Sequence, residues 1–331
     1  MSRNQQMVKI WRIVTLGAGV LLLASPSVAQ TPSSLLAQVN GVPNPAPNPS
    51  TGQPASPAPP TNGPTAESQL ALGLDYIQQG QVDQAIAAFQ QAVALNPRLA
   101  AAHYNLGLAL RQQGHLQTAA TSFYQAIQAD PNFAMSYANL GAALLEGGNL
   151  TQAEQYLQRA IQLDPNMALA HYNMGLVKRQ QGNLQEAVTA FRKAMNLSSS
   201  AAEPAYHLGL LYLQQGQVRD AVEALQKAVT INPQYAEAHY SLGTIWYQRG
   251  NFEEALNAFR RSAEANPNYP NAYYGAGLVF LRQGKPTDAQ QVLQHARDLF
   301  AAQQNLPWAN SAAQLLQQAQ TMNVAPQPQP Q

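Results

Sequence analysis

Residues 103–131 read HYNLGLALRQQGHLQTAATSFYQAIQADP, and a shift of 34 residues in either direction returns the same skeleton. Two glycine positions and one alanine position of this skeleton each recur seven times along the chain of 331 residues. The second glycine of the stretch, Gly114, recurs every 34 residues from Gly80 to Gly284. Ala119 recurs with the same period from Ala85 to Ala289. The sequence therefore predicts seven contiguous copies of one structural unit. The first glycine of each unit is Gly73, Gly107, Gly141, Gly175, Gly209, Gly243 or Gly277.

Each unit holds two amphipathic patterns, such as residues 101–113 and 116–129, separated by the second glycine. Their spacing is that of α-helices, so the unit is predicted to be a helix, a turn and a helix. A glycine inside a helix costs about 1 kcal/mol relative to alanine, so a packing reason is required. We expect Gly107 to let the first helix approach the bulky Phe123 of the second helix. We expect Gly114 to end the first helix in a left-handed conformation.

Proline ends the second helix in most units, because it cannot continue a helix and restricts the residue before it. The prolines in this register are Pro97, Pro131, Pro165, Pro233 and Pro267. The fourth unit has Ser198, Ser199 and Ser200 instead, where Asp-Pro-Asn is usual. We therefore expect the stack to bend or loosen at this point.

The repeats span residues 66–300 and are flanked by segments of different composition. Residues 30–65 are dominated by Pro, Asn, Ser, Thr, Gly and Ala, which predicts a disordered linker with too little apolar surface to fold. Residues 301–322 have apolar side chains on one face and glutamines on the other, as expected of a capping helix. Residues 323–331 resemble the linker in composition and are predicted to form a disordered tail.

Residues 1–29 have the features of an export signal. Basic residues precede an apolar run, residues 13–24, and the triplet Ser27-Val28-Ala29 offers a cleavage site. The run is shorter than the roughly 20 residues with which a helix crosses a bilayer. We therefore expect an exported protein, periplasmic or secreted. The alternative is an uncleaved signal that anchors the chain to the inner membrane.

Charge and composition argue against several classes of partner and chemistry. The formal net charge is +1, and the chain after residue 29 carries 15 basic and 17 acidic side chains. Basic residues do not gather into a stripe, so we expect no nucleic-acid partner. Cysteine is absent, which excludes thiol catalysis, thiolate zinc sites and disulfide bonds together.

No constellation in the sequence predicts catalysis or metal binding. His103, His171 and His239 share one register but lie two repeats apart, too far to ligate one ion, so we predict packing roles. The chain has no phosphate-binding loop, no nucleophile elbow and no His-Glu-x-x-His motif. Its acidic residues are scattered without a pair spaced for acid–base work. We therefore expect a non-enzymatic protein with no catalytic residues, no metal and no cofactor.

The skeleton formed by Gly107, Gly114, Ala119, Phe123 and Pro131 resembles that of the tetratricopeptide repeat family. The resemblance covers about 235 residues and includes all seven units. It implies an all-α fold, a right-handed superhelical solenoid of helix pairs whose first helices line a concave groove. One departure is Lys178, at a position that is aromatic or apolar in the family.

The resemblance also points positions two, five, six, nine, twelve and thirteen of each repeat into the groove, with Gly107 as position eight. Position five holds five tyrosines, which either contact a partner or fill space between first helices. Position six holds three successive asparagines, similar to the ladder in the repeats of O-GlcNAc transferases, where amides hold an extended peptide. The alternative is that these amides only solvate the groove. The predicted groove residues are Tyr104, Asn105, Leu108, Arg111, Asn139, Tyr172, Asn173, Arg179, Tyr206, Tyr240 and Tyr274.

These features predict a scaffold or adaptor of the cell envelope that binds an extended segment of another protein in the groove. The catalytic region of O-GlcNAc transferases has no counterpart in this sequence. A second interpretation is a non-catalytic accessory subunit of an envelope enzyme, for example in glycan or polysaccharide assembly. Self-association through exposed solenoid ends is a third interpretation, which the polar capping helix opposes. Contact with a membrane is expected only through an uncleaved signal anchor.

Overall fold

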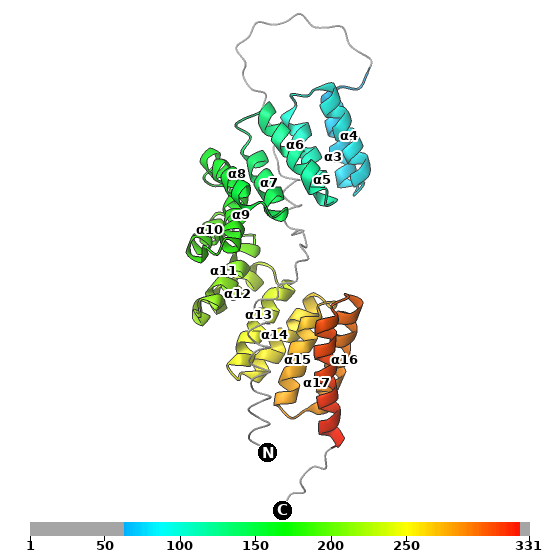
Figure 1. Ribbon diagram of the computed structural model, residues 1–331, viewed down its shortest axis with the longest axis vertical. Helices are drawn as coiled ribbons and strands as arrows, with labels where there is room; N and C mark the ends of the chain where they lie inside the picture. Colours follow the sequence, from blue (N-terminus) through cyan, green and yellow to red (C-terminus); the bar gives the residue numbers. More distant parts are fainter. Residues whose placement is uncertain (1–62, 325–331) are drawn as a thin grey trace, which may run out of the picture. The chain divides into compact units, whose positions relative to one another are not determined.

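The computed structural model describes residues 63–324, which form fifteen helices and no strand (Figure 1). The first helices of the seven repeats are α3 (Ala66–Gln78), α5 (Ala100–Gln112), α7 (Ala134–Glu146), α9 (Ala168–Gln180), α11 (Glu203–Gln214), α13 (Ala236–Gln248) and α15 (Pro270–Arg282). The second helices are α4 (Val82–Leu95), α6 (Leu116–Ala129), α8 (Leu150–Leu163), α10 (Leu184–Leu197), α12 (Val218–Ile231), α14 (Phe252–Ala265) and α16 (Pro286–Ala302). The last helix is α17 (Leu306–Val324). This is the all-α repeat solenoid that the sequence predicts.

Some of the predicted segments lie outside the described residues. These are the signal over residues 1–29, the linker over residues 30–62 and the tail from residue 325 onward. None of the helices α3–α17 combines the length and the apolar character that a membrane crossing requires.

The helix pair depends on the two glycines of each repeat, as the second repeat illustrates. A Cβ atom on Gly107 of α5 would lie 2.7 Å from Cε1 of Phe123 on α6, closer than atoms can pack. Phe123 is fully buried and cannot swing away. Gly114, between the two helices, has a φ of +80° in the left-handed region that side chains resist. The roles predicted for both glycines are confirmed, and the other repeats show the same arrangement.

Side chains also fix the turn that joins one repeat to the next. Oδ1 of Asp130 accepts a hydrogen bond of 2.9 Å from the backbone N–H of Asn132, across Pro131. Equivalent bonds are accepted by Asn96, Asp164, Asn232 and Asn266. Ser198 occupies this register in the fourth repeat, and within residues 63–324 it accepts no such bond.

The turn after this serine differs from the others. Helix α11 begins at Glu203, one residue later in register than the other first helices. Contacts across the junction are nevertheless present, since Nη1 of Arg179 on α9 lies 3.0 Å from Nδ1 of His207 on α11 and the Tyr172 and His207 rings are 5.8 Å apart. That the stack bends or loosens here stays a prediction.

The three histidines that share a register stabilise these turns. Nε2 of His103 bonds the carbonyl oxygen of Pro97 at 3.0 Å, and His171 and His239 contact the prolines of their own preceding turns in the same way. A neutral imidazole donates its Nε2 proton in such a bond. These histidines therefore have a structural role in the turns, whereas packing between helices stays a prediction.

Helix α17 covers the end of the last repeat. Its Trp308 ring stacks on Phe300 with 5.9 Å between centroids, and Nε2 of Gln290 donates to the Ala319 carbonyl at 3.1 Å. The predicted boundaries of this cap, residues 301–322, are wrong at both ends. Residues 301–302 continue α16, and the turn is made by Gln304 with a φ of +58°. The cap therefore begins at Leu306 and extends two residues into the segment predicted as tail.

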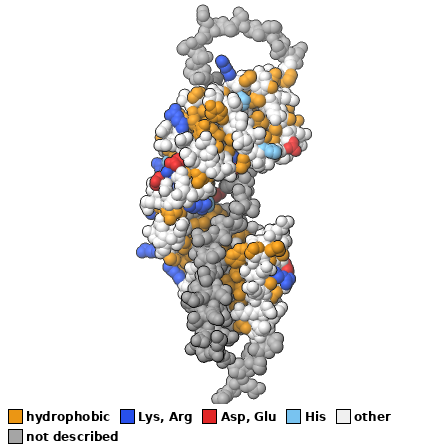
Figure 2. Space-filling model, in the orientation of Figure 1, with side chains coloured by type: hydrophobic (Ala, Val, Ile, Leu, Met, Phe, Trp, Pro, Cys, Tyr) orange, Lys and Arg blue, Asp and Glu red, His pale blue; other side chains and the backbone are white. Residues whose placement is uncertain are grey.

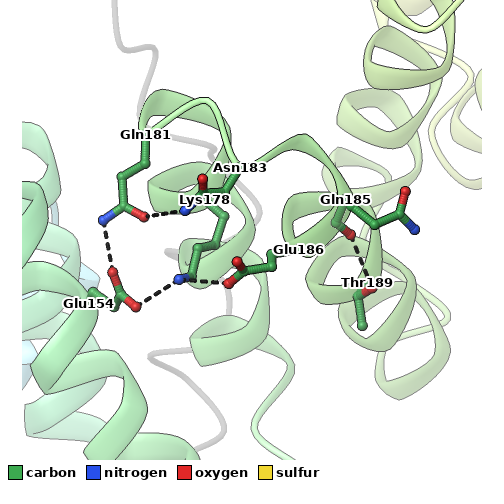
Figure 3. Close-up of polar contacts among 7 residues, drawn as sticks. All are labelled: Glu154, Lys178, Gln181, Asn183, Gln185, Glu186 and Thr189. Atoms are coloured by element: carbon green, nitrogen blue, oxygen red, sulfur yellow. Dashed lines mark hydrogen bonds and ion pairs between the residues drawn. The ribbon is translucent and has the colours of Figure 1, made fainter.

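Lys178 stands where the repeat family has an aromatic or apolar residue, and its ion pairs join three helices (Figure 3). Its Nζ lies 2.7 Å from a carboxylate oxygen of Glu154 on α8 and 2.7 Å from one of Glu186 on α10. Nε2 of Gln181 donates to the other oxygen of Glu154 at 2.8 Å. These bonds tie the third repeat to the fourth.

Candidate functional site

The face formed by the first helices is the inner face of the stack. First helices of several successive repeats touch each other directly, whereas no pair of second helices in the described range makes comparable contact. A row of stacked helices curves toward the side on which its members are closest. Bonds between α5 and α7 join positions five, six and twelve, so these positions lie on this more closely packed side, and we call this surface the inner face.

The tyrosines predicted for this face divide into two groups. Tyr104, Tyr240 and Tyr274 are buried, with 5 to 9% of their surface exposed. The Tyr104 ring packs between Phe123 and Phe133, with centroid distances of 5.9 and 5.0 Å. Tyr172 and Tyr206 remain partly exposed. Some tyrosines of this register thus fill space, and contact with a partner through the partly exposed Tyr172 and Tyr206 stays a prediction.

Burial keeps these phenols neutral. It raises the pKa of Tyr104 to about 12, an effect that Arg111 and the Asn139 amide partly offset. Burial likewise raises the pKa of Tyr206 and that of Tyr274 to about 12. The hydroxyl groups are therefore hydrogen-bond donors and acceptors at physiological pH, and none is a candidate base.

The three predicted asparagines have different surroundings. Asn105 is partly exposed, and its Nδ2 donates to the Ala101 carbonyl at 2.8 Å. Asn139 is buried, and its Nδ2 donates to Met135 O at 2.9 Å and to the Tyr104 hydroxyl at 3.3 Å. Its Oδ1 accepts from Nη1 of Arg111 at 3.1 Å. The amide of Asn139 is therefore committed to internal bonds.

Asn173 is buried to the same degree, but its Nδ2 has no hydrogen-bond partner in the described structure. The reason lies in the preceding repeat. The counterparts of Tyr104 and Arg111 there are Ala138 and Leu145, which offer no polar side-chain atom. An unpaired buried amide costs about 1–3 kcal/mol.

The two predicted arginines bridge neighbouring repeats. Arg111 pairs with Glu146 at 3.0 Å while it donates to Asn139. Nη1 of Arg179 lies 3.0 Å from Nδ1 of His207, twenty-eight residues away, which is the same spacing in sequence as Arg111 and Asn139. Burial and the nearby Arg179 charge lower the pKa of His207 to about 3, so its ring is neutral and Nδ1 accepts. Both arginines thus have internal partners.

The remaining candidates add little to the inner face. Leu108 is partly buried and packs against the core around Phe123 and Leu140. On the face drawn in Figure 2, Lys and Arg side chains are spaced apart, and some lie beside acidic ones. In residues 63–324, no three His, Asp or Glu side chains lie close enough to hold a metal ion.

Two tyrosines of the inner face were not among the sequence predictions. Tyr235 and Tyr269 precede α13 and α15, in a register that elsewhere holds Leu99, Phe133 and Met167. The Tyr235 ring packs on Tyr206 with 4.9 Å between centroids, and the Tyr269 ring meets Tyr240 edge-on at 5.7 Å. The sequence shows that this register holds apolar or aromatic residues. It does not show that these residues lie beside the tyrosines at position five.

Two family models match the sequence. The one described as the C-terminal domain of cilia and flagella-associated protein 70 matches residues 46–272, and the one described as tetratricopeptide repeat matches residues 247–304. Among curated proteins, none is similar enough to the chain to be a relative.

Solved structures share the fold. The Cut9–Hcn1 hetero-tetramer of APC/C aligns with a TM-score of 0.58 and 17% identity, over 77% of this chain and 54% of that one. PilF of Pseudomonas aeruginosa aligns with a TM-score of 0.56 and 22% identity, over 62% and 94%. YrrB, described as a TPR protein with an unusual peptide-binding site, has a TM-score of 0.47 and 28% identity, over 59% and 99%. The closer similarity to O-GlcNAc transferase repeats stays a prediction.

Proposed function

Because the chain belongs to the tetratricopeptide repeat family represented by the C-terminal domain of cilia and flagella-associated protein 70, we propose that it is a non-enzymatic scaffold that binds an extended segment of a partner protein on its inner face. The observation that supports this most directly is the pair of partly exposed tyrosines on that face, Tyr172 and Tyr206. The buried Asn173 amide lies out of reach of a peptide on the surface.

The partly exposed tyrosines of the same face favour a protein partner. Tyr172 and Tyr206 combine a rigid apolar ring with a neutral hydroxyl, and such side chains provide much of the contact energy at protein interfaces. Asn105 adds an amide with exposed surface. Asn139 is not part of the proposed contact, because its amide is already bonded on both sides.

The proposal extends to location, which the apolar run and cleavage triplet of residues 1–29 support. Sequencing the N-terminus of the mature protein from its native host tests this part. A chain that begins after Ala29 supports export. A chain that begins at Met1 contradicts cleavage and favours the membrane anchor.

Site-specific photo-crosslinking tests the binding function. A photoreactive amino acid at Asn105 would face the groove, whereas one at Tyr124 on α6 would face solvent, since 43% of that side chain is exposed. We expect a covalent partner from position 105 and none from position 124 when the full chain is irradiated in its host. Crosslinks of equal yield from both positions would contradict binding on the inner face.

A further inference from the structure

Four aromatic rings follow one another on the inner face between α9 and the start of α13. The Tyr172 ring on α9 lies 5.8 Å from that of His207 on α11, measured between centroids. The His207 ring lies 5.2 Å from that of Tyr206, which in turn lies 4.9 Å from that of Tyr235, just before α13. All four side chains are partly exposed. We call these four residues the ring row.

The N-terminal segment of the same chain has the chemistry to bind such rings. Residues 43–60 contain eight prolines, and Pro54, Pro57 and Pro60 recur at every third position. Proline favours the polyproline II helix, which has three residues per turn and rises about 3.1 Å per residue. Proline-rich segments of this kind dock against aromatic side chains, and their carbonyl groups accept hydrogen bonds from hydroxyl groups. Residues 13–66 carry no charged side chain, so the segment meets no repulsion from the charges of the inner face.

The step of the segment matches the step of the repeats. Direct contacts join α3 to α5, α5 to α7 and α7 to α9, and the bond between Arg179 and His207 continues the series to α11. Helices in contact lie about 8–10 Å apart. One turn of polyproline II advances by about 9 Å, so each turn of the segment passes about one repeat.

The segment also joins the repeats at the end where the inner face begins. Thr65 is the N-cap of α3, and its Oγ1 accepts a hydrogen bond of 3.1 Å from the backbone N–H of Ser68. Oγ of Ser68 accepts one of 2.9 Å from the N–H of Thr65, so this capping box fixes where the chain enters α3. The 22 residues from 43 to 64 span about 68 Å as polyproline II. Helix α13 is five first-helix spacings from α3, about 40–50 Å, so the segment is long enough to reach the ring row of its own molecule.

We propose that residues 43–60, which lie outside the described part of the chain, bind the ring row of their own molecule and compete there with the partner. The inference rests on the proposed function and specifies its regulation. A tether of this length gives an effective concentration on the order of 1 mM. A segment with a Kd of about 0.1 mM would then leave about one tenth of the inner faces free. The apparent affinity for a partner would be about tenfold lower.

Photo-crosslinking within the purified full chain tests the occupancy. Benzoylphenylalanine replaces Tyr206 in the ring row or, as the matched control, Tyr124 on α6, which is 43% exposed. We expect irradiation to join position 206 to a residue within 43–60, identified by peptide mapping with mass spectrometry. Position 124 should give at least about tenfold less of this product, since it lies on a second helix. The product should remain monomeric, with a yield that does not depend on protein concentration.

A variant with serine in place of the eight prolines of residues 43–60 keeps the length of the segment and removes its polyproline II preference. It should reduce the crosslink from position 206 at least about fivefold. In the native host, the same variant should raise the capture of a partner from position 105 about tenfold, because the inner face is no longer occupied. Helicity by circular dichroism confirms that the repeats are folded, since the substitutions lie outside them.

The possible failures separate the two proposals. Equal products from positions 206 and 124, or from the proline and serine segments, overturn the occupancy and leave partner binding intact. A dimeric product whose yield rises with concentration overturns it as well, because the segment would then bind a second copy. Unchanged capture from position 105 in the serine variant overturns the competition. An intramolecular product at position 206, together with no covalent partner from position 105 in either form, supports the occupancy and overturns the proposed function.

Discussion

Gly107 shows how little space separates the two helices of one repeat. A methyl group there would overlap the ring of Phe123, which is fully buried and has nowhere to move. We expect Gly107→Ala to lower the free energy of unfolding by about 1–3 kcal/mol, in spite of the higher helix propensity of alanine. Urea denaturation followed by circular dichroism measures the change.

Gly147 provides the control for this substitution. It ends α7 with a negative φ of −77°, and a Cβ there would meet nothing closer than 3.4 Å. Gly147→Ala should therefore be neutral or stabilise the protein by up to about 1 kcal/mol. If both substitutions had the same effect, close packing would not be the reason for the glycine at position 107.

Asn139 and Asn173 have the same register and the same burial but different bonding. Asn139→Ala removes bonds to Tyr104, Arg111 and a backbone carbonyl, and should destabilise the protein by about 2 kcal/mol. Asn173→Ala removes an unpaired amide, and should stay within about 1 kcal/mol of the wild type or stabilise it. Urea titrations of the two variants test the contrast. A large loss for Asn173→Ala would show that this amide has a partner, such as a buried water.

At the scale of the helix, the contact around Lys178 couples α9 to its neighbours. Lys178→Met leaves the carboxylates of Glu154 and Glu186 without their shared cation, and should lower the free energy of unfolding by about 1 kcal/mol at neutral pH. The change is modest because Glu154 is partly exposed and Glu186 is exposed. Arg260→Met, which disrupts an exposed pair with Glu264, is the control and should have no measurable effect.

The same contact has a defined pH dependence. Hydrogen bonds from Lys178 and Gln181 lower the pKa of Glu154, so its stabilisation is complete above the ordinary glutamate value of about 4.3. It is lost as the pH falls through the lower value of the folded state. Bonds to both glutamates raise the pKa of Lys178, so its contribution is lost only in strong alkali. The difference between wild type and Lys178→Met should therefore be constant near neutrality and shrink in acid.

Helix boundaries were predictable wherever a glycine or proline marks them. The turn at Gly114 and the turn at Pro131 illustrate this, since each residue type has a backbone restriction that can be read from the sequence. The start of the last helix was not predictable in this way. Gln304 makes that turn with a positive φ although it is not a glycine, and residues 301–302 favour the helix that precedes it.

For the whole molecule, the period was sufficient to predict the solenoid and the inner face, but not the state of each side chain on that face. Asn139 is bonded because Arg111 lies 28 residues before it, and Asn173 is unpaired because Leu145 stands at the equivalent distance. Such contacts depend on how one repeat stacks on the next. A pattern within one repeat cannot show them. The sequence therefore could not tell which asparagines and tyrosines of positions six and five are exposed and which belong to the core.

The junction at Ser198 should divide the solenoid into two blocks that unfold separately. In repeat arrays, stability is a sum over repeats and their interfaces, so one weak interface lowers the cooperativity of the whole. Here the Asp-Pro-Asn turn is missing, and α11 begins one residue later in register than the other first helices. Trp246 and Trp308 both lie after this junction, whereas circular dichroism reports all helices.

With Trp11 replaced by Phe, denaturation followed by fluorescence should therefore have a different midpoint from denaturation followed by helicity. The triple substitution Ser198→Asp, Ser199→Pro and Ser200→Asn should bring the midpoints together. Ser198 already has the extended conformation that a following proline requires, with φ −130° and ψ 110°. Coincident midpoints in the wild type would mean that the interface is as strong as the others, because only a weak interface lets the two blocks unfold apart.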